Sequence, residues 1–563
     1  MAGTKTLTNA GWLRTYPKAW LRYDIVAGLT AAAVVIPKAM ACAVIAGLPV
    51  ESGLYTGLAA MLVYPLLGTS RSLSVSTTTT IAMMTAAEVA VIAKTGPEVA
   101  AGAVGVTLAL LVGGIMILAR LLRLGYIANF ISTPVLTGFQ AGIGVAIVVS
   151  QLKSVLGVHL TSHATLGVLA ELPRTLHAVH LPTVFVGLAG IGLLLALERL
   201  FPKSPAPLVL VVLSIIAAGL FHLEALGVKL VGTVPSGLPA PQLPNFSLVG
   251  KLWPAALGIA LMSLTESIAA ARSFARHGDR RIDPNRELLA VGAANVAAAF
   301  FGGFPAGGGT SQTAVNDKAG ARSQMAQITT AGVVVVSLLF LSRVIGLLPQ
   351  ASLGALVIVV SASMIKPAKF RAIRRIRLEE FIWALVAMIG VIVIGTLEGV
   401  LVAVGISILT LFYHANHPPV YEVAYNQEKR IFRQLGENAD DVTFPGLLLL
   451  RTEGRLHFAS APRVSDQMRA LVDKINPEVV VLEMSAVPDI EYSALMMLSE
   501  AVDNQRARGV EVWLAALNPD ILKVVGRSPL EGKLGRERMF FNLHKAVEAY
   551  RARAERSGPK KEA

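Results

Sequence analysis

The sequence predicts an all-α polytopic membrane domain followed by a smaller α/β domain. Of its 563 residues, 54% are hydrophobic and only 15% are charged, whereas soluble proteins carry about a quarter of charged residues. The apolar residues gather in runs such as FIWALVAMIGVIVIGT, close to the roughly 20 residues that cross a bilayer. After HANHPPV, near residue 415, polar and charged residues become frequent. We therefore expect a membrane domain over residues 21–415 and a soluble domain over residues 420–555.

The apolar runs of the first part divide into about fourteen segments of spanning character. Two of them, residues 77–92 and 310–320, are short and begin in sequence rich in Thr, Ser and Gly. They come third and tenth, which are corresponding places if the domain consists of two sets of seven. Because seven is odd, the second set would be inverted in the membrane. Paired short segments in the two halves of a transporter indicate its binding site.

The basic residues indicate which connections face the cytoplasm. With a cytoplasmic N-terminus, Lys and Arg are several times more frequent in the inner connections than in the outer ones, as the positive-inside rule requires. We therefore expect a multi-pass protein of the cell (inner) membrane, with residues 1–20 and the C-terminal domain in the cytoplasm. Membrane topology also explains the net charge of +14, so nucleic acid is not an expected partner.

Several kinds of site are not expected from the sequence. Cys42 is the only cysteine, which excludes a disulfide or a cysteine-built metal site within the chain. No constellation of nucleophile and base, and no metal-binding cluster, stands out in the sequence. We therefore predict neither an enzyme nor a bound cofactor or metal.

Two stretches carry recognisable motifs. Residues 24–76 contain D-x-x-AGLT, IP-x-x-MA, AGLP-x-x-x-GLY and GTSR, and residues 295–324 contain FGG-x-P and TAVN-x-x-x-GAR. Together they resemble the SulP family of anion transporters, the sulfate permease and solute carrier 26 group. The resemblance implies a seven-plus-seven inverted repeat with a core and a gate domain, alternating access and a homodimer. It also implies that an anion lies between the N-termini of the third and tenth segments.

Helix N-termini suit this role because about four N–H groups there lack partners and the helix end carries about half a positive charge. The chain departs from the family pattern at four places. Lys38 stands where the family commonly has Gln, and Cys42 where it often has Tyr. Ser76-Thr77 stands where the family usually has Gly-Pro, and Gln312 where it commonly has Arg. Compared with the family pattern, the positive charge is in the first segment, at Lys38, and not in the tenth. The candidate substrate-binding residues are Lys38, Cys42, Thr77, Thr78, Thr79, Thr80, Gly309, Thr310, Ser311 and Gln312.

Lys38 and Glu266 are charged residues within predicted spanning segments. At a helical rise of about 1.5 Å per residue, Lys38 lies about 20 Å beyond Asp24. It either supplies the positive charge of the anion site or forms a structural pair with Glu266. In the family, an acidic residue at the place of Glu266 is tied to cation coupling. Removal from water favours the protonated carboxyl, whereas a neighbouring cation favours the ionised one, so the residues leave the coupling open.

The predicted function is secondary active transport of a small anion, either coupled to protons or by exchange. Sulfate-like anions, bicarbonate and dicarboxylates all suit paired helix ends, and the charge of Lys38 favours a divalent or carboxylate-bearing anion. Na⁺-coupled bicarbonate transport and an uncoupled anion path are alternatives. An alternative of another class is a membrane anion sensor that signals through the C-terminal domain.

The C-terminal domain shows an alternation of strands and helices. GLLLLRTEGRLHFASA predicts strand, turn and strand, EVVVLEMSAV a buried strand, YSALMMLSEAVDNQRARG a helix and VEVWLAAL another strand. The segment VVVLEMSAVPDIEYSAL resembles the signature of STAS domains. The resemblance implies that Ser493 is a regulatory phosphorylation site, and otherwise Ser493 is a residue near a helix N-cap. Residues 556–563 are expected to be a disordered tail.

Overall fold

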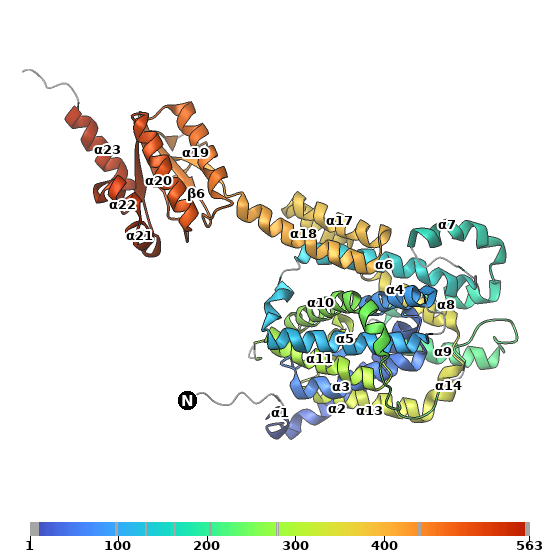
Figure 1. Cartoon of the computed structure of the whole chain (residues 1–563). Helices are drawn as coiled ribbons and strands as arrows, with labels where there is room; N and C mark the ends of the chain where they lie inside the picture. The colour runs from blue at the N-terminus through green and yellow to red at the C-terminus, as the bar shows by residue number, and fades with distance from the viewer. Residues whose placement is uncertain are drawn as a thin grey trace, which may run out of the picture. The chain divides into compact units, whose positions relative to one another are not determined.

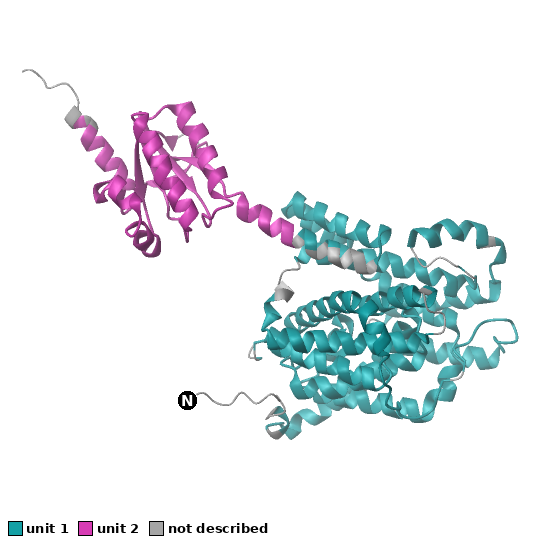
Figure 2. Cartoon of the chain, in the orientation of Figure 1, with its two compact units in different colours: residues 1–407 teal, residues 408–563 magenta. Residues whose placement is uncertain are grey.

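The computed structural model describes residues 11–95, 99–129, 132–158, 160, 165–201, 205–232, 234–276, 279, 281–436 and 441–557. The chain forms two compact units, residues 1–407 (unit 1) and 408–563 (unit 2), shown in Figure 2. The first half of the predicted N-terminal segment 1–20 lies outside the described residues, as does nearly all of the predicted tail 556–563.

Unit 1 is helical (Figure 1). Its helices are α1 (Gly11–Arg14), α2 (Leu21–Ile45), α3 (Val50–Leu67), α4 (Thr79–Thr95), α5 (Ala101–Leu121), α6 (Thr133–Leu156), α7 (Thr165–Thr175), α8 (Leu181–Leu200), α9 (Ala206–Leu220), α10 (Val249–Ser273), α11 (Pro284–Phe300), α12 (Thr310–Lys318), α13 (Met325–Val336), α14 (Ser342–Gly346), α15 (Gln350–Ala362), α16 (Pro367–Ile376), α17 (Leu378–Val393) and α18 (Thr396–Asn416).

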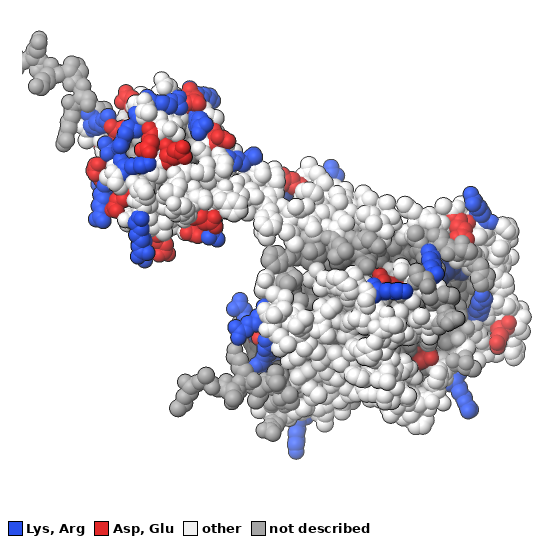
Figure 3. All heavy atoms as spheres, in the orientation of Figure 1, with Lys and Arg blue, Asp and Glu red and all other residues white. Residues whose placement is uncertain are grey.

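The composition of these helices matches a membrane environment. Within the described residues, 8 helices are long and apolar enough to cross a bilayer. Figure 3 shows a surface of unit 1 with few charged side chains, whereas charged side chains are dense on unit 2. α4 has 17 residues and α12 has 9, lengths of about 26 and 14 Å, less than the hydrocarbon core of about 30 Å. The two predicted short helices are therefore confirmed.

Small residues let these helices pack backbone against backbone, as is common in membranes. A Cβ atom on Gly138 of α6 would lie 1.8 Å from the carbonyl oxygen of Ala384 on α17. A Cβ atom on Gly53 of α3 would lie 2.0 Å from the carbonyl oxygen of Ala39 on α2. Only glycine fits at these two contacts.

Two buried carboxylates accept hydrogen bonds from loops between the helices and so fix the position of these loops. Asp24 of α2 accepts hydrogen bonds from the backbone N–H groups of Arg322 (2.7 Å) and Ser323 (3.1 Å) and from the hydroxyl of Tyr16 (2.8 Å). Burial and the neighbouring Asp24 raise the pKa of Tyr16 to about 12. Glu287 of α11 accepts in the same way from the N–H of Thr69 at 2.8 Å. The D-x-x-AGLT and GAR motifs thus meet in space, and GTSR is tied to α11.

Unit 2 is an α/β domain built on one sheet, with strand order β4-β3-β6-β7-β8-β9 and β5 beside β3. β6 to β9 are parallel, and β3 is antiparallel to its neighbours. The strands are β3 (Val420–Asn426), β4 (Ile431–Gln434), β5 (Asp441–Val442), β6 (Leu447–Thr452), β7 (Val479–Glu483), β8 (Glu511–Ala515) and β9 (Met539–Phe540). The helices are α19 (Ala461–Ile475), α20 (Tyr492–Ala507), α21 (Pro519–Val525), α22 (Pro529–Leu534) and α23 (Leu543–Ser557).

Helices cover both faces of this sheet. Leu448 and Leu450 of β6 pack in one core with α19 to α22, whereas Leu447 and Leu449 pack in a second core with α23. This explains why the central strands are apolar without alternation, as expected for parallel strands buried on both sides.

The predicted strands at β7 and β8 and the helix at α20 are confirmed. The second strand predicted in GLLLLRTEGRLHFASA is wrong, because after β6 only an isolated bridge joins Leu456 to Ile490. The N–H of Gly454 donates to Ala486 O and that of Leu456 to Asp489 O. The segment thus pairs with the connection between β7 and α20, and no hairpin with β6 forms.

We predict that Asp24→Ala lowers the melting temperature of the purified full chain in detergent. The substitution leaves the buried N–H groups of Arg322 and Ser323 without an acceptor, and each such loss costs about 1–3 kcal/mol. Asp520→Ala is the control, because the Asp520 side chain is 88% exposed. Equal melting temperatures for the two variants would contradict the structural role of Asp24.

Candidate functional site

A two-residue antiparallel ladder lies at the centre of the candidate site. β1 (Val75–Ser76) pairs with β2 (Gly307–Gly308), with Val75 opposite Gly308 and Ser76 opposite Gly307. β1 leads directly into α4, and β2 leads directly into α12. Because the strands are antiparallel, the chain leaves the ladder in opposite directions. The N-terminal ends of the two short helices therefore flank the ladder.

Side chains from both halves of unit 1 hold the ladder. The N–H of Ser74 donates to Thr313 Oγ1 (3.1 Å), and the N–H of Gly309 donates to Ser74 O (3.0 Å). Gln312 Nε2 donates to Thr77 O at 3.1 Å, so the side chain at the usual Arg position joins the two helix starts. Ser74 and Thr313 were not among the predicted site residues, and hydroxyls in a short apolar segment were the only signal for them.

α10 supports the other side of β2. The N–H of Gly308 donates to Ser267 Oγ (2.8 Å), and Ser263 Oγ donates to Ala306 O (2.7 Å). A Cβ atom on Gly308 would lie 2.7 Å from Ser267 Cα. Glycine at this position therefore permits the close approach of β2 to α10.

Glu266 of α10 contacts the start of α4 through hydroxyls. Thr78 Oγ1 donates to Glu266 Oε2 (3.0 Å) and accepts from the N–H of Ile81 (3.3 Å), so it also caps the helix. Thr80, also at the start of α4, lies close to the same carboxyl. In the described part of the chain, Glu266 forms no ion pair with Lys38, although the two charges interact electrostatically.

Lys38 lies in a small cavity beside the start of α4. The cavity has a volume of about 10 Å³ and is lined by Lys38 and Cys42 of α2 and by Thr79 of α4, with α15 contributing Leu356, Val357 and Val360. Lys38 is only 8% exposed. A buried cation of this kind is rare in a membrane domain and usually marks a ligand or ion path.

The start of α4 also has unused hydrogen-bonding capacity. The hydroxyls of Ser76 and Thr77 are buried and have no hydrogen-bond partner among the described residues. Buried hydroxyls without partners are uncommon in proteins. Free hydroxyls, a helix start and an ammonium group are each suitable partners for a small anion, and Thr79 is the residue of α4 that lines the cavity beside Lys38.

The remaining predicted residues are less close together. Gly309 is buried, whereas Thr310 and Ser311 are exposed at the start of α12 and do not line the cavity. Ser493 is exposed in the first turn of α20, and the N-cap of that helix is Glu491.

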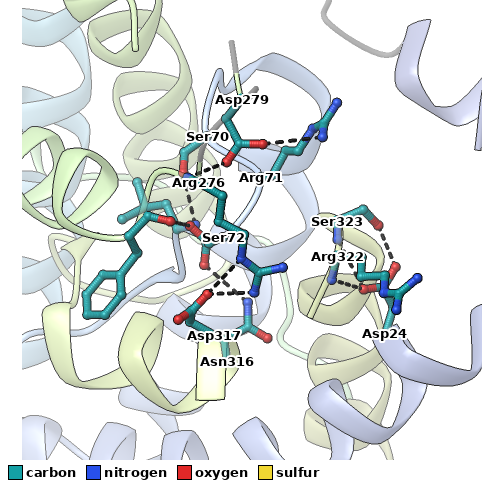
Figure 4. Close-up of polar contacts among 12 residues, drawn as sticks. Asp24, Ser70, Arg71, Ser72, Arg276, Asp279, Asn316, Asp317, Arg322 and Ser323 are labelled. Carbon is teal, nitrogen blue, oxygen red and sulfur yellow. Dashed lines mark hydrogen bonds and ion pairs between the residues drawn. The ribbon is translucent and has the colours of Figure 1, made fainter. Parts of the chain in front are cut away.

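The far end of α12 is held by charged side chains (Figure 4). Arg276, just after α10, pairs with Asp317 of α12 at 2.6 Å, and Arg71 pairs with Asp279 at 3.3 Å. Asn316 Nδ2 donates to Ser72 O at 3.1 Å. α12 is therefore fixed at both ends. From the sequence, Arg276 indicated only membrane topology, and Arg71 was the last residue of the GTSR motif.

Known proteins are similar to this chain over nearly all of its length. Residues 21–408 match the profile of the sulfate permease family, and residues 438–546 match that of the STAS domain. A probable sulfate transporter of Mycobacterium tuberculosis is 34% identical over 97% of this chain and 100% of its own length. The chloroplastic sulfate transporter 4.1 of Arabidopsis thaliana is 28% identical over 95% of this chain and 81% of its own length.

Two solved structures have a similar fold. Murine solute carrier 26 family member A9, in the inward-facing state, superposes with a TM-score of 0.87 at 21% identity, covering 98% of this chain and 96% of its own. The transmembrane domain of the cyanobacterial bicarbonate transporter BicA superposes with a TM-score of 0.61 at 24% identity, covering 69% of this chain and 98% of its own.

We predict that Gly308→Ala destabilises unit 1, because the new Cβ would lie 2.7 Å from the backbone of Ser267. Overpacking of this kind costs about 1–3 kcal/mol. Gly332→Ala on α13 is the matched control, because a Cβ there meets nothing within 4 Å. Thermal unfolding in detergent should show a lower melting temperature for Gly308→Ala alone. A melting temperature equal to that of the control would refute the close packing of β2 on α10.

Proposed function

Because the chain belongs to the sulfate permease family, we propose that it carries a small anion across the cell membrane by alternating access. It is a multi-pass membrane protein with a C-terminal STAS domain, and its named relatives are transporters, not enzymes. The main support for this mechanism is the β1–β2 ladder, which brings two helix starts together beside the buried Lys38.

In this proposal the membrane domain has about fourteen spans in two inverted sets of seven. α2 to α5 and α10 to α14 form the core, and α6, α8, α9, α15, α17 and α18 form the gate. The N-terminus and the STAS domain are cytoplasmic, the membrane is the cell (inner) membrane, and the protein is a homodimer. The cavity supports this division, because Lys38 and Cys42 of the core face Val357 of the gate across it.

Lys38 supplies the full positive charge of the anion site. Gln312 is neutral and is already hydrogen-bonded to Thr77 O, so the tenth-segment position provides no cation here. The attraction between an anion and Lys38 is strong because the site is largely shielded from water. Thr77 and Ser76 supply free hydroxyls just before α4. The names of the relatives favour sulfate, and that of the bicarbonate transporter makes bicarbonate the alternative.

Glu266 is the proposed site of proton coupling. Its carboxyl group is hydrogen-bonded to Thr78, which caps α4 at the anion site. A proton on Glu266 removes a negative charge close to the bound anion and so strengthens anion binding. There are two alternatives to proton coupling. In the first, the oxygens of Glu266 and of neighbouring hydroxyls hold Na⁺. In the second, no coupling ion binds and the anion path is uncoupled.

We predict that Lys38→Gln reduces anion uptake at least about tenfold, the effect of losing one strong charged contact. The full chain is reconstituted in liposomes, and uptake of labelled sulfate, bicarbonate and succinate is measured. Lys369→Gln is the control, because Lys369 is exposed on α16. Unchanged uptake by Lys38→Gln would exclude its role in the anion site. Saturable binding without flux in the native chain would favour an anion sensor.

We further predict that an inward proton gradient stimulates uptake by the native chain and does not stimulate uptake by Glu266→Gln. The glutamine keeps the size and a hydrogen-bond acceptor for Thr78 but cannot exchange a proton. The measurement is the ratio of uptake with and without the gradient. A ratio of one in the native chain would favour exchange or Na⁺ coupling, which replacement of Na⁺ by choline then separates.

A further inference from the structure

Unit 2 contains a cavity that the transport function does not use. It has a volume of about 330 Å³ and lies between the sheet and helices α19 and α20. This volume is within the range of about 300–1,000 Å³ for small-molecule sites. Its walls are mainly apolar side chains from three strands and two helices, among them Leu450, Met468, Val480, Leu482, Met497 and Leu498.

These apolar walls favour a ligand whose larger part is apolar. A water molecule needs two to four polar partners to occupy a buried site, and leucine, valine and methionine side chains offer none. Met468 and Met497 lie on opposite helices, and methionine adapts easily to ligands of different shape. The space between two helices over a sheet is suited to an extended hydrocarbon chain.

The two charged side chains that line the cavity lie toward the C-terminal ends of α19 and α20, whereas the neutral polar residues Thr452 and Ser465 line it elsewhere. Arg469 of α19, Gln505 of α20 and Arg508 just after α20 line the cavity. Arg508 is paired with Asp473 of α19 at 2.6 Å. Arg469 has no ion-pair partner among the described residues, and Gln505 Oε1 is buried without a hydrogen-bond partner. This end of the cavity therefore has an excess of one positive charge.

We propose that this cavity binds a medium-chain carboxylate, such as a fatty acid anion. The hydrocarbon chain lies between α19 and α20, and the carboxylate binds Arg469. A guanidinium group binds a carboxylate through two parallel hydrogen bonds, and the Gln505 amide, which lines the same cavity, offers a further N–H donor. The site lies wholly within unit 2 and does not depend on the proposed transport mechanism.

The test uses the full chain in liposomes and decanoate that carries a photoreactive diazirine at its apolar end. After illumination, mass spectrometry identifies the labelled peptides. We expect label on peptides from α19, α20 or β6, displaced by unlabelled decanoate and displaced at least about tenfold less well by decylamine, which has the opposite charge. Label on these peptides that both compounds displace equally would overturn the recognition of a carboxylate.

Two variants and a matched control complete the test. Arg469→Gln should reduce the label in unit 2 about tenfold, the loss expected for one charged hydrogen-bonded contact. Arg463→Gln should leave it unchanged, because Arg463 is exposed on the same helix and does not line the cavity. Ala501→Phe should fill the cavity and remove the label. Equal labelling of native chain, Arg469→Gln and Arg463→Gln, or no label in unit 2, would overturn the proposal. This conclusion holds even if Ala501→Phe fails to fold, because Arg469 is exposed.

Discussion

The candidate site depends on the pairing of Val75–Ser76 with Gly307–Gly308. Extended backbone inside a bilayer must find hydrogen-bond partners within the protein, because lipid provides none. Here each strand is the partner of the other, and Ser267 and Thr313 satisfy the neighbouring amides. Thr77 and Gln312 are joined although they are 235 residues apart in the sequence. Neither half of the membrane domain can form this site alone.

The helices could largely be predicted from the sequence, because their apolar runs are local patterns. The two short helices and the approach of Lys38 to Cys42 follow from composition and helical spacing. The ladder, the cap of α4 by Thr78 and the packing of Gly308 on Ser267 could not be predicted, because each depends on partners far away in the sequence. The wrong strand at Leu456 has the same cause, since its partners are in the loop before α20.

Buried charges have two different kinds of surroundings in the membrane domain. Asp24 and Glu287 each accept several hydrogen bonds from residues in loops, and these bonds hold the loops against the helices. Lys38 has a cavity beside it and hydroxyls without partners nearby. An ionisable group in a membrane is expensive to bury, and its surroundings distinguish a structural role from a role in binding. The clearest difference between Asp24 or Glu287 and Lys38 is the number of hydrogen bonds that the buried group makes with the rest of the protein.

The burial of Lys38 on α2 also has an electrical consequence for the proposed transporter. Lys38 of α2 and Glu266 of α10 both belong to the proposed core domain, so in that proposal their charges cross the membrane field with the ligand. With an ionised Glu266 the empty site is neutral, and its return requires no work against the membrane voltage. With a protonated Glu266, the charge of Lys38 and that of a divalent anion sum to −1. Moving this charge across a membrane potential of 100 mV changes the free energy by about 2.3 kcal/mol. With a monovalent anion the protonated, loaded site is neutral, so the membrane voltage would distinguish the two classes of substrate.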